Sequence, residues 1–277
     1  MRPLLTMAGV TFREAARRRI LWTALGCGAV LLAIFAVALR LQVMEFQGRP
    51  MSPFVRYQVE AGMLMIGLYT CDLLAVVMTI LTSIDTIAGE ISSATIHAIA
   101  TKPLARWQII VGKFIGFAAM VVIYVSLTFA GTVAVAYGVT GVLPEHPLRG
   151  LLLMVFECLI ALSLTFCFGT WFSTLTNGVI VLGLQAVAFM GGWLEQVSGF
   201  SQSAQIVTLG VWSSLAMPGE SLWRRAAYEM QTPLAGSLSF SPFANVSIPS
   251  GTAVGYAGVY FVVVMAVAIV HFRRRDL

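Results

Sequence analysis

Charged residues are scarce in this sequence. Asp, Glu, Lys and Arg together make up 10% of the 277 residues, against about 25% in an ordinary soluble domain. Apolar residues make up 58%, and the mean hydropathy is +0.88. So few charges cannot cover the surface of a soluble globule of this size. The composition therefore excludes a soluble protein and predicts a chain that crosses a membrane several times.

Residues that bind metals or form disulfides are also few. The histidines fall in three separate predicted loops or boundaries, where they cannot readily share a metal ion: His97, His146 and His271. The cysteines all lie within apolar runs, and no two have the two-residue spacing of a zinc motif: Cys27, Cys71, Cys158 and Cys167. We therefore expect neither a metal site nor a disulfide framework.

Motifs for nucleotide binding and hydrolysis are missing. Gly112 and Lys113 precede Phe114 instead of Ser or Thr, and no glycine lies five residues before Gly112, so the chain has no phosphate-binding loop of the usual kind. Neither a Gly-x-Ser-x-Gly nor a His-Glu-x-x-His motif occurs. We expect no catalytic residue and no cofactor bound by this chain, which predicts a non-catalytic membrane subunit.

Apolar runs account for most of the sequence. Six runs are long enough to cross about 30 Å of hydrocarbon as helices that rise about 1.5 Å per residue: 20–39, 62–84, 114–139, 151–172, 178–194 and 253–272. The predicted fold class is therefore an all-α polytopic membrane protein with six transmembrane helices. We expect residues 1–277 to form a single transmembrane domain.

Basic residues set the predicted topology. The net charge of +5 could suggest a nucleic-acid partner, but Lys and Arg flank the apolar runs instead of forming a continuous basic stripe. We therefore expect no nucleic-acid partner. Most of the 17 basic residues lie on one side if both termini are cytoplasmic, as the positive-inside rule favours. The prediction is a multi-pass protein with both termini inside.

Three segments outside the spans have patterns of their own. Residues 1–19 carry an apolar stripe at Leu5, Ala8, Phe12 and Ala15, which is typical of an interfacial helix; the alternative is a charged topogenic flank. Residues 195–252 form an external insertion with two short helices, one at 205–217 and one capped by Ser221. Residues 173–177 form a tight inner turn.

The inner connection at residues 85–113 contains a further amphipathic pattern. Apolar residues recur at helical spacing from Ile84 to Ala98, and Lys102-Pro103 would end the helix. A helix held between two spans is suited to docking on a cytosolic partner and passing its movement into the membrane. The alternative is a solvated interfacial loop.

This region resembles the membrane subunits of type 2 ATP-binding-cassette (ABC) transporters. Glu90, Ser93-Ala94-Thr95, Pro103, Arg106 and Lys113 are similar to the family pattern E-x-x-x-G-T, P-x-x-R, K, with Ala94 where members often have glycine. The tail at 272–277, FRRRDL, and the turn at 172–177, FSTLTN, are also similar to the family. The resemblance covers nearly the whole chain.

The resemblance implies a permease of an ATP-driven exporter in a bacterial cytoplasmic (inner) membrane, surrounded by lipid. Its partners would be a second permease, either a copy or a paralogue, and a dimer of cytosolic ATPase subunits that bind ATP and Mg. The helix near Glu90 would dock in a groove on the ATPase. The implied coupling residues are Glu90, Ser93, Thr95, His97, Pro103, Arg106 and Lys113.

Two acids fall inside predicted spans. Asp72 lies about ten residues into the second span, roughly 15 Å deep, and Glu157 lies about a third of the way into the fourth. Because a charge at this depth costs about 2.5 kcal/mol or more in insertion assays, each acid is expected to face a cavity, a partner or water. They are candidates either to line a pathway or to hold helices together.

Two other functions remain open from the sequence. One is a membrane scaffold that couples an ATPase to an envelope enzyme or assembly process without moving a substrate. The other is a secondary transporter that uses Asp72 or Glu157 as a proton site. A gene for an ATPase beside this one would favour the exporter or the scaffold, which both depend on ATP, over the secondary transporter.

Overall fold

The computed structural model describes residues 2–17, 19–47, 52–92, 105–201, 204–231 and 249–274. The described residues form helices joined by short turns and contain no strand. In chain order the helices are α1 (Arg2–Arg17), α2 (Arg19–Gln47), α3 (Pro53–Ser83), α4 (Asp85–Ser92), α6 (Arg106–Thr140), α7 (Pro147–Gly169), α8 (Thr174–Ser201), α9 (Ala204–Ala216), α10 (Gly219–Met230) and α11 (Gly251–Arg274).

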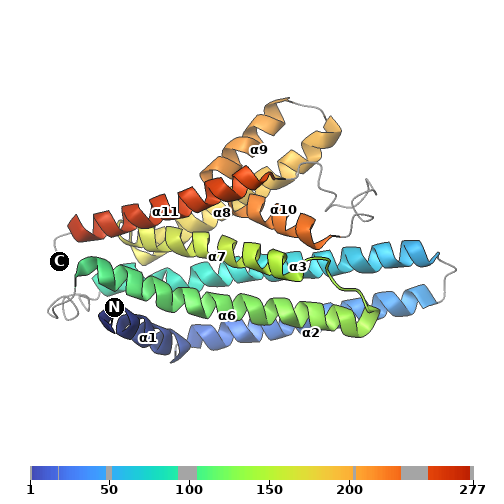
Figure 1. The fold of residues 1–277 in the computed structure, drawn as a ribbon, viewed down its shortest axis with the longest axis horizontal. Coiled ribbons are helices and arrows are strands. Elements are labelled where there is room, and N and C mark those ends of the chain that lie inside the picture. The colour runs from blue at the N-terminus through green and yellow to red at the C-terminus, as the bar shows by residue number, and fades with distance from the viewer. Residues whose placement is uncertain are drawn as a thin grey trace.

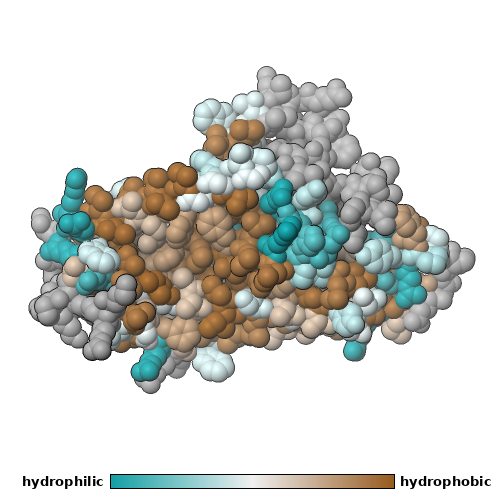
Figure 2. Space-filling model, viewed as in Figure 1, coloured by the Kyte–Doolittle hydropathy of each residue, from teal (hydrophilic) through white to brown (hydrophobic). Residues whose placement is uncertain are grey.

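Six of these helices are long and apolar enough to cross a membrane: α2, α3, α6, α7, α8 and α11. This confirms the predicted all-α polytopic fold. Both termini lie at the same end of the bundle (Figure 1), which we call the near end; the opposite end is the far end. Figure 2 shows apolar side chains over most of the length of the bundle, with polar side chains toward both ends.

Local sequence signals explain where several helices begin and end. Ser52 accepts a hydrogen bond from the backbone N–H of Val55 as the N-cap of α3, and Pro53 follows at the first helical position, where a missing N–H costs nothing. Gly141 ends α6 with a φ of 75°, a left-handed conformation that favours glycine. Pro147 then begins α7.

Helix α1 packs along the first turns of α6 at the near end. Gly112 and Gly116, four residues apart on α6, leave room for the close approach: a Cβ on Gly116 would lie 2.8 Å from the backbone oxygen of Ala8. Small residues at this spacing allow two membrane helices to pack backbone to backbone. Within the predicted apolar stripe, Ala8 and Ala15 are buried, whereas Leu5 is 66% exposed.

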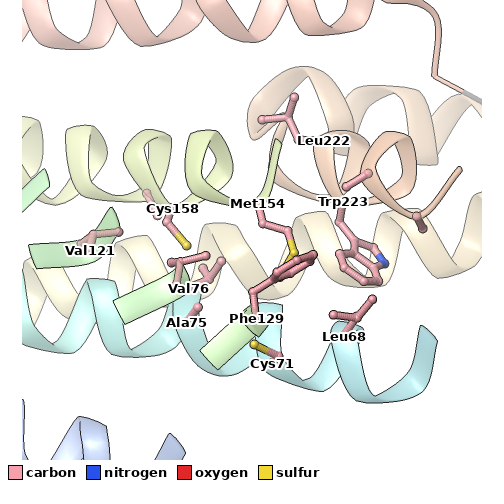
Figure 3. Close-up of a cluster of buried hydrophobic side chains, with 14 of the residues drawn as sticks. Leu68, Cys71, Ala75, Val76, Val121, Phe129, Met154, Cys158, Leu222 and Trp223 are labelled. Carbon is pink, nitrogen blue, oxygen red and sulfur yellow. The ribbon is translucent and has the colours of Figure 1, made fainter. Parts of the chain in front are cut away.

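Apolar side chains fill the interior of the bundle. In the main cluster, residues of α3, α6, α7 and α10 interdigitate, as Figure 3 shows for Leu68, Phe129, Met154 and Trp223. A second cluster lies among α6, α7 and α11 and includes Phe166 and Phe272. The middle of the bundle is therefore a packed core.

The turn between the fourth and fifth spans differs from the sequence prediction. Helix α7 ends at Gly169 and not at Phe172, and α8 begins at Thr174. Asn177 therefore lies in the first turn of α8 instead of in a loop. The turn therefore lies at residues 170–173, and the Thr170 hydroxyl donates to the Cys167 carbonyl at 2.7 Å.

The region between α8 and α11 also differs from prediction. Helix α8 continues to Ser201, beyond the span that ends at Leu194, and α9 folds back along α8 to form a hairpin that projects from the bundle (Figure 1). Helix α10 begins at Gly219 after Pro218, two residues before the predicted cap at Ser221. The Ser221 hydroxyl instead donates to the Pro218 oxygen at 2.7 Å within the first turn.

Candidate functional site

The candidate coupling region begins where α3 passes into α4 at the near end. Ile84 keeps right-handed helical backbone angles, so the chain bends little between the two helices. Ile87 and Ala88 of α4 are buried, and α4 contacts the near ends of α7 and α8. Helix α4 is therefore an extension of the second span that is fixed against two others.

Asn177 joins three of these elements. Its side-chain amide nitrogen Nδ2 donates to the Thr165 oxygen on α7 at 2.9 Å and to the Ile84 oxygen before α4 at 3.4 Å. One turn deeper, the hydroxyls of Ser83 and Thr165 are hydrogen-bonded at 2.8 Å. Because all these residues are buried, apart from the half-buried Ile84, the bonds replace water contacts that the helix ends cannot make.

A second bond lies at the surface of the same junction. The Thr174 hydroxyl at the start of α8 donates to Asp85 Oδ1 at the start of α4, at 3.1 Å. A displacement of α4 must therefore move α8 or break these contacts. The sequence indicated α4 itself, but no spacing rule pairs Asp85 with Thr174 or Ile84 with Asn177.

The predicted coupling residues are only partly covered by the described structure. Glu90 lies within α4. Arg106 begins α6 and donates from Nη1 to the Arg273 backbone oxygen of α11 at 3.2 Å, while Lys113 is buried two turns later. Ser93, Thr95, His97 and Pro103 lie outside the described residues. Their role in coupling stays a prediction.

The two predicted span acids lie side by side. Asp72 of α3 and Glu157 of α7 are 3% and 1% exposed, and their carboxyl groups are close enough to interact with each other. The packing of α7 against α3 brings Glu157, predicted about a third of the way into the fourth span, beside Asp72 of the second span.

Other polar residues complete this acid cluster. Gln185 of α8 donates from Nε2 to Glu157 Oε1 at 3.3 Å. Gly219, the first residue of α10, lies directly over the pair: a Cβ there would be 3.0 Å from Glu157 Oε1 and 3.4 Å from Gln185 Oε1. The absence of a side chain at Gly219 is what lets the connection from α9 to α10 reach these groups.

Helix α10 adds a third acid and a cation. Glu220 and Arg224, one turn apart, are both buried. Burial raises the pKa of the Glu220 carboxyl from 4.5 to about 8, the Arg224 charge lowers it, and the Asp72 charge raises it. Glu220 and Arg224 were not predicted as site residues because α10 was expected to belong to the external insertion, and Gln185 was not singled out within the fifth predicted span.

Aromatic rings cover the far side of the acid cluster. The Tyr69 ring packs against Trp223 with centroids 5.0 Å apart, and the Trp193 indole donates to the Tyr69 hydroxyl at 3.4 Å. These three residues come from α3, α10 and α8. The cluster is therefore enclosed in protein and does not line an open pathway in this conformation.

Neither region has the composition of a metalloenzyme site. Within the part of the chain that the structure describes, no group of three His, Cys, Asp or Glu residues could hold a metal ion. The near end instead contains the hydrogen-bonded junction between α4, α7 and α8, and the buried interior contains a cluster of ionisable side chains.

Comparison with known families agrees with this organisation. A family model described as "ABC-2 family transporter protein" matches residues 6–277. The chain belongs to the ABC-2 family of transporter proteins. No curated protein matches the sequence.

Membership of the ABC-2 family confirms the resemblance drawn from the motifs around Glu90 and the tail. ABC-2 proteins of this type are generally non-catalytic membrane components that associate with an ATPase. The match extends from within α1 through the inner connection, the α8–α9 hairpin and α10 to α11. It therefore covers both the coupling region and the buried acid cluster.

Proposed function

We propose that the chain is the permease of an ATP-driven exporter. It would pair with a second permease, either a copy or a paralogue, and bind two cytosolic ATPase subunits that hold ATP and Mg. The near end of the bundle, with both termini, would face the cytoplasm of a bacterial inner membrane.

The observation that carries this proposal is the bonded junction between α4 and the α7–α8 turn. Asn177 and Thr174 connect α4 to α8 through the backbone of Ile84 and the carboxylate of Asp85. A force applied to α4 by a closing ATPase dimer would pass directly into α8. Helix α8 in turn carries α9, so the motion would reach the far end of the molecule.

The packing supports a pathway between two permeases instead of within one. The interior of this chain is filled by the two apolar clusters, whereas α2 and α11 bury little of their length. On α2 the exposed apolar side chains include Val30, Ile34, Val37 and Leu41. Such faces are stable against lipid or against another apolar helix, and a second permease would supply the missing wall of a pathway.

Co-purification tests the proposed ATPase contact. The chain would be expressed with the ATPase encoded beside it, and the amount of bound ATPase and its rate of ATP hydrolysis would be measured. Charge reversal by Glu90→Lys should weaken docking by more than tenfold, because loss of one partner in a desolvated charge pair costs about 2–5 kcal/mol. Glu145→Lys makes the same charge change at the exposed far end and serves as the matched control.

Two results would contradict the proposed contact. One is wild-type ATPase yield and hydrolysis from the Glu90→Lys complex. The other is an equal loss in the Glu145→Lys complex, which would show a general effect of charge instead of a docking site. Docking with no movement of any solute would favour the scaffold function.

A further inference from the structure

Three buried oxygen atoms in the acid cluster have no hydrogen-bond donor among the described residues. They are Asp72 Oδ1, Glu157 Oε2 and Gln185 Oε1. Their side chains are all more than nine-tenths buried and come from three different spans. An unsatisfied buried polar group costs about 1–3 kcal/mol, and more if it is charged, so this arrangement requires something that supplies a donor.

The pairing of Asp72 with Glu157 indicates which hydrogen-bond donor these oxygen atoms lack. An ionised carboxyl group accepts hydrogen bonds and donates none, whereas a protonated one has an O–H that donates. Two carboxylates in contact, away from water, cannot both carry a charge, so one is held in the neutral form. A single proton removes one charge and supplies the donor that the pair lacks.

The other titratable groups around Asp72 and Glu157 do not replace the proton as a source of positive charge and of a hydrogen-bond donor. From α10 come Glu220 and Arg224, whose charges oppose each other. The remaining titratable neighbours are phenol and thiol groups of α3 and α7, which are neutral when protonated: Tyr69, Cys71 and Cys158. Gln185 donates to Glu157 Oε1 and leaves the Asp72 side of the pair unsatisfied.

We propose that Asp72 and Glu157 form a proton-binding site within the membrane, in which one proton shared by the two carboxyl groups bonds α3 to α7 beneath the α9–α10 connection. The ligand is the proton itself. Loss of the proton would leave two negative charges between α3 and α7, below Gly219, where a Cβ would lie 3.0 Å from Glu157 Oε1. The shared proton therefore holds α3 against α7.

Infrared difference spectroscopy tests this site directly. The purified permease with its ATPase, in lipid nanodiscs at pH 7, would carry Glu220→Gln in every sample, because Glu220 also has a raised pKa of about 8. On this background the protein should show the C=O stretching band of a protonated carboxyl group, and this band should shift in D2O. Asp72→Asn and Glu157→Gln should each abolish it, because each removes one member of the pair. Glu60→Gln is the matched control and should keep the band, since Glu60 is a buried acid on α3 that accepts a hydrogen bond from Arg56 Nε at 2.8 Å and is not a member of the Asp72–Glu157 pair.

A melting experiment tests the bond between α3 and α7. An amide can donate where the shared proton did, so Asp72→Asn and Glu157→Gln should melt within a few degrees of the wild type. Asp72→Leu leaves Glu157 without its partner and should melt at a clearly lower temperature. If Asp72→Asn fails to fold, Glu157→Gln provides the same test from the other side of the pair.

Three outcomes would overturn the proposal. The first is a wild-type spectrum without the protonated-carboxyl band, and the second is a band that persists in both Asp72→Asn and Glu157→Gln. The third is a melting temperature that rises with added Na⁺ or K⁺ at constant ionic strength in the wild type but not in Glu157→Gln. That last result would assign the site to a metal cation instead of a proton.

Discussion

Asn177 and Ile84 lie 93 positions apart in the sequence, yet the side-chain amide of Asn177 donates to the Ile84 backbone oxygen at 3.4 Å. The same nitrogen donates to Thr165 at 2.9 Å. One side chain therefore joins the end of α3, the near end of α7 and the start of α8. This is the point at which motion of α4 is expected to enter the membrane.

Replacing Asn177 should weaken this junction. Asn177→Ala leaves two backbone oxygens without their donor and should lower the free energy of unfolding by about 1–3 kcal/mol. It should also reduce transport per ATP hydrolysed without releasing the ATPase. Asn177→Asp, which keeps the shape but lacks the N–H donors, should behave in the same way.

Thr176→Ala is the matched control for Asn177. Thr176 is one residue away and exposed, and its hydroxyl is hydrogen-bonded to that of Ser173 at 3.0 Å. Thermal unfolding and the ratio of transport to ATP hydrolysis are the two measurements. Equal effects from Asn177→Ala and Thr176→Ala would contradict the coupling role of the amide.

The contact between α1 and α6 gives a second prediction. Gly116→Ala places a methyl group 2.8 Å from the Ala8 oxygen and 2.9 Å from the Thr11 Cβ. Because one of these neighbours is backbone, α1 must move, at a cost of about 1–3 kcal/mol. Gly138→Ala on the same helix meets nothing within 4 Å and should be neutral. Melting temperatures of the two variants check this, and equal values would show that α1 does not pack here.

Much of this architecture could be predicted from the sequence because membranes impose simple rules. A run of about 20 apolar residues must form a helix to satisfy its backbone, so all six spans were found. The errors came at the ends of elements. Nothing in the composition shows that Thr170 closes α7 on Cys167 or that α10 begins at Gly219 before Ser221.

The site was harder to predict than the fold. Asp72 and Glu157 were individually conspicuous as acids in apolar runs, but their contact depends on how α3 and α7 are rotated. Glu220 looked like an ordinary acid of an amphipathic surface helix. Only the close approach allowed at Gly219 places α10 inside the bundle, and a single glycine carries no such signal in the sequence.

Glu220 gives a prediction about pH. Burial raises the pKa of its carboxyl from 4.5 to about 8 in the folded protein, so the folded state binds a proton that the unfolded state has released. The free energy of unfolding should therefore fall as the pH rises from about 4.5 to about 8, by at most about 1.4 kcal/mol per pH unit from this group.

The variant Glu220→Gln should remove this part of the pH dependence, because glutamine stays neutral throughout. Melting temperatures measured from pH 4.5 to pH 8 on both proteins test it. The Arg224 and Asp72 charges act on Glu220 in opposite directions and remain in both proteins. A wild-type slope that is unchanged in Glu220→Gln would show that Glu220 does not bind the proton.

Cysteine labelling tests the direction of the bundle. Single cysteines at Ser52 and Glu145, which are exposed at the far end, should react with a membrane-impermeant thiol reagent added to intact cells. A cysteine at Ser173, exposed at the near end, should react only after the cells are opened. Labelling of Ser173→Cys in intact cells would reverse the proposed topology.

The most direct test of ATP-driven transport uses inside-out membrane vesicles that contain the permease and its ATPase. Mass spectrometry of the vesicle contents, after incubation with cell extract and either Mg-ATP or Mg-ADP, measures which solutes are moved. We predict at least one compound that accumulates with Mg-ATP, survives a proton ionophore, and is lost in Glu90→Lys but retained in Glu145→Lys. Identical contents with Mg-ATP and Mg-ADP while ATP hydrolysis continues would contradict the exporter function.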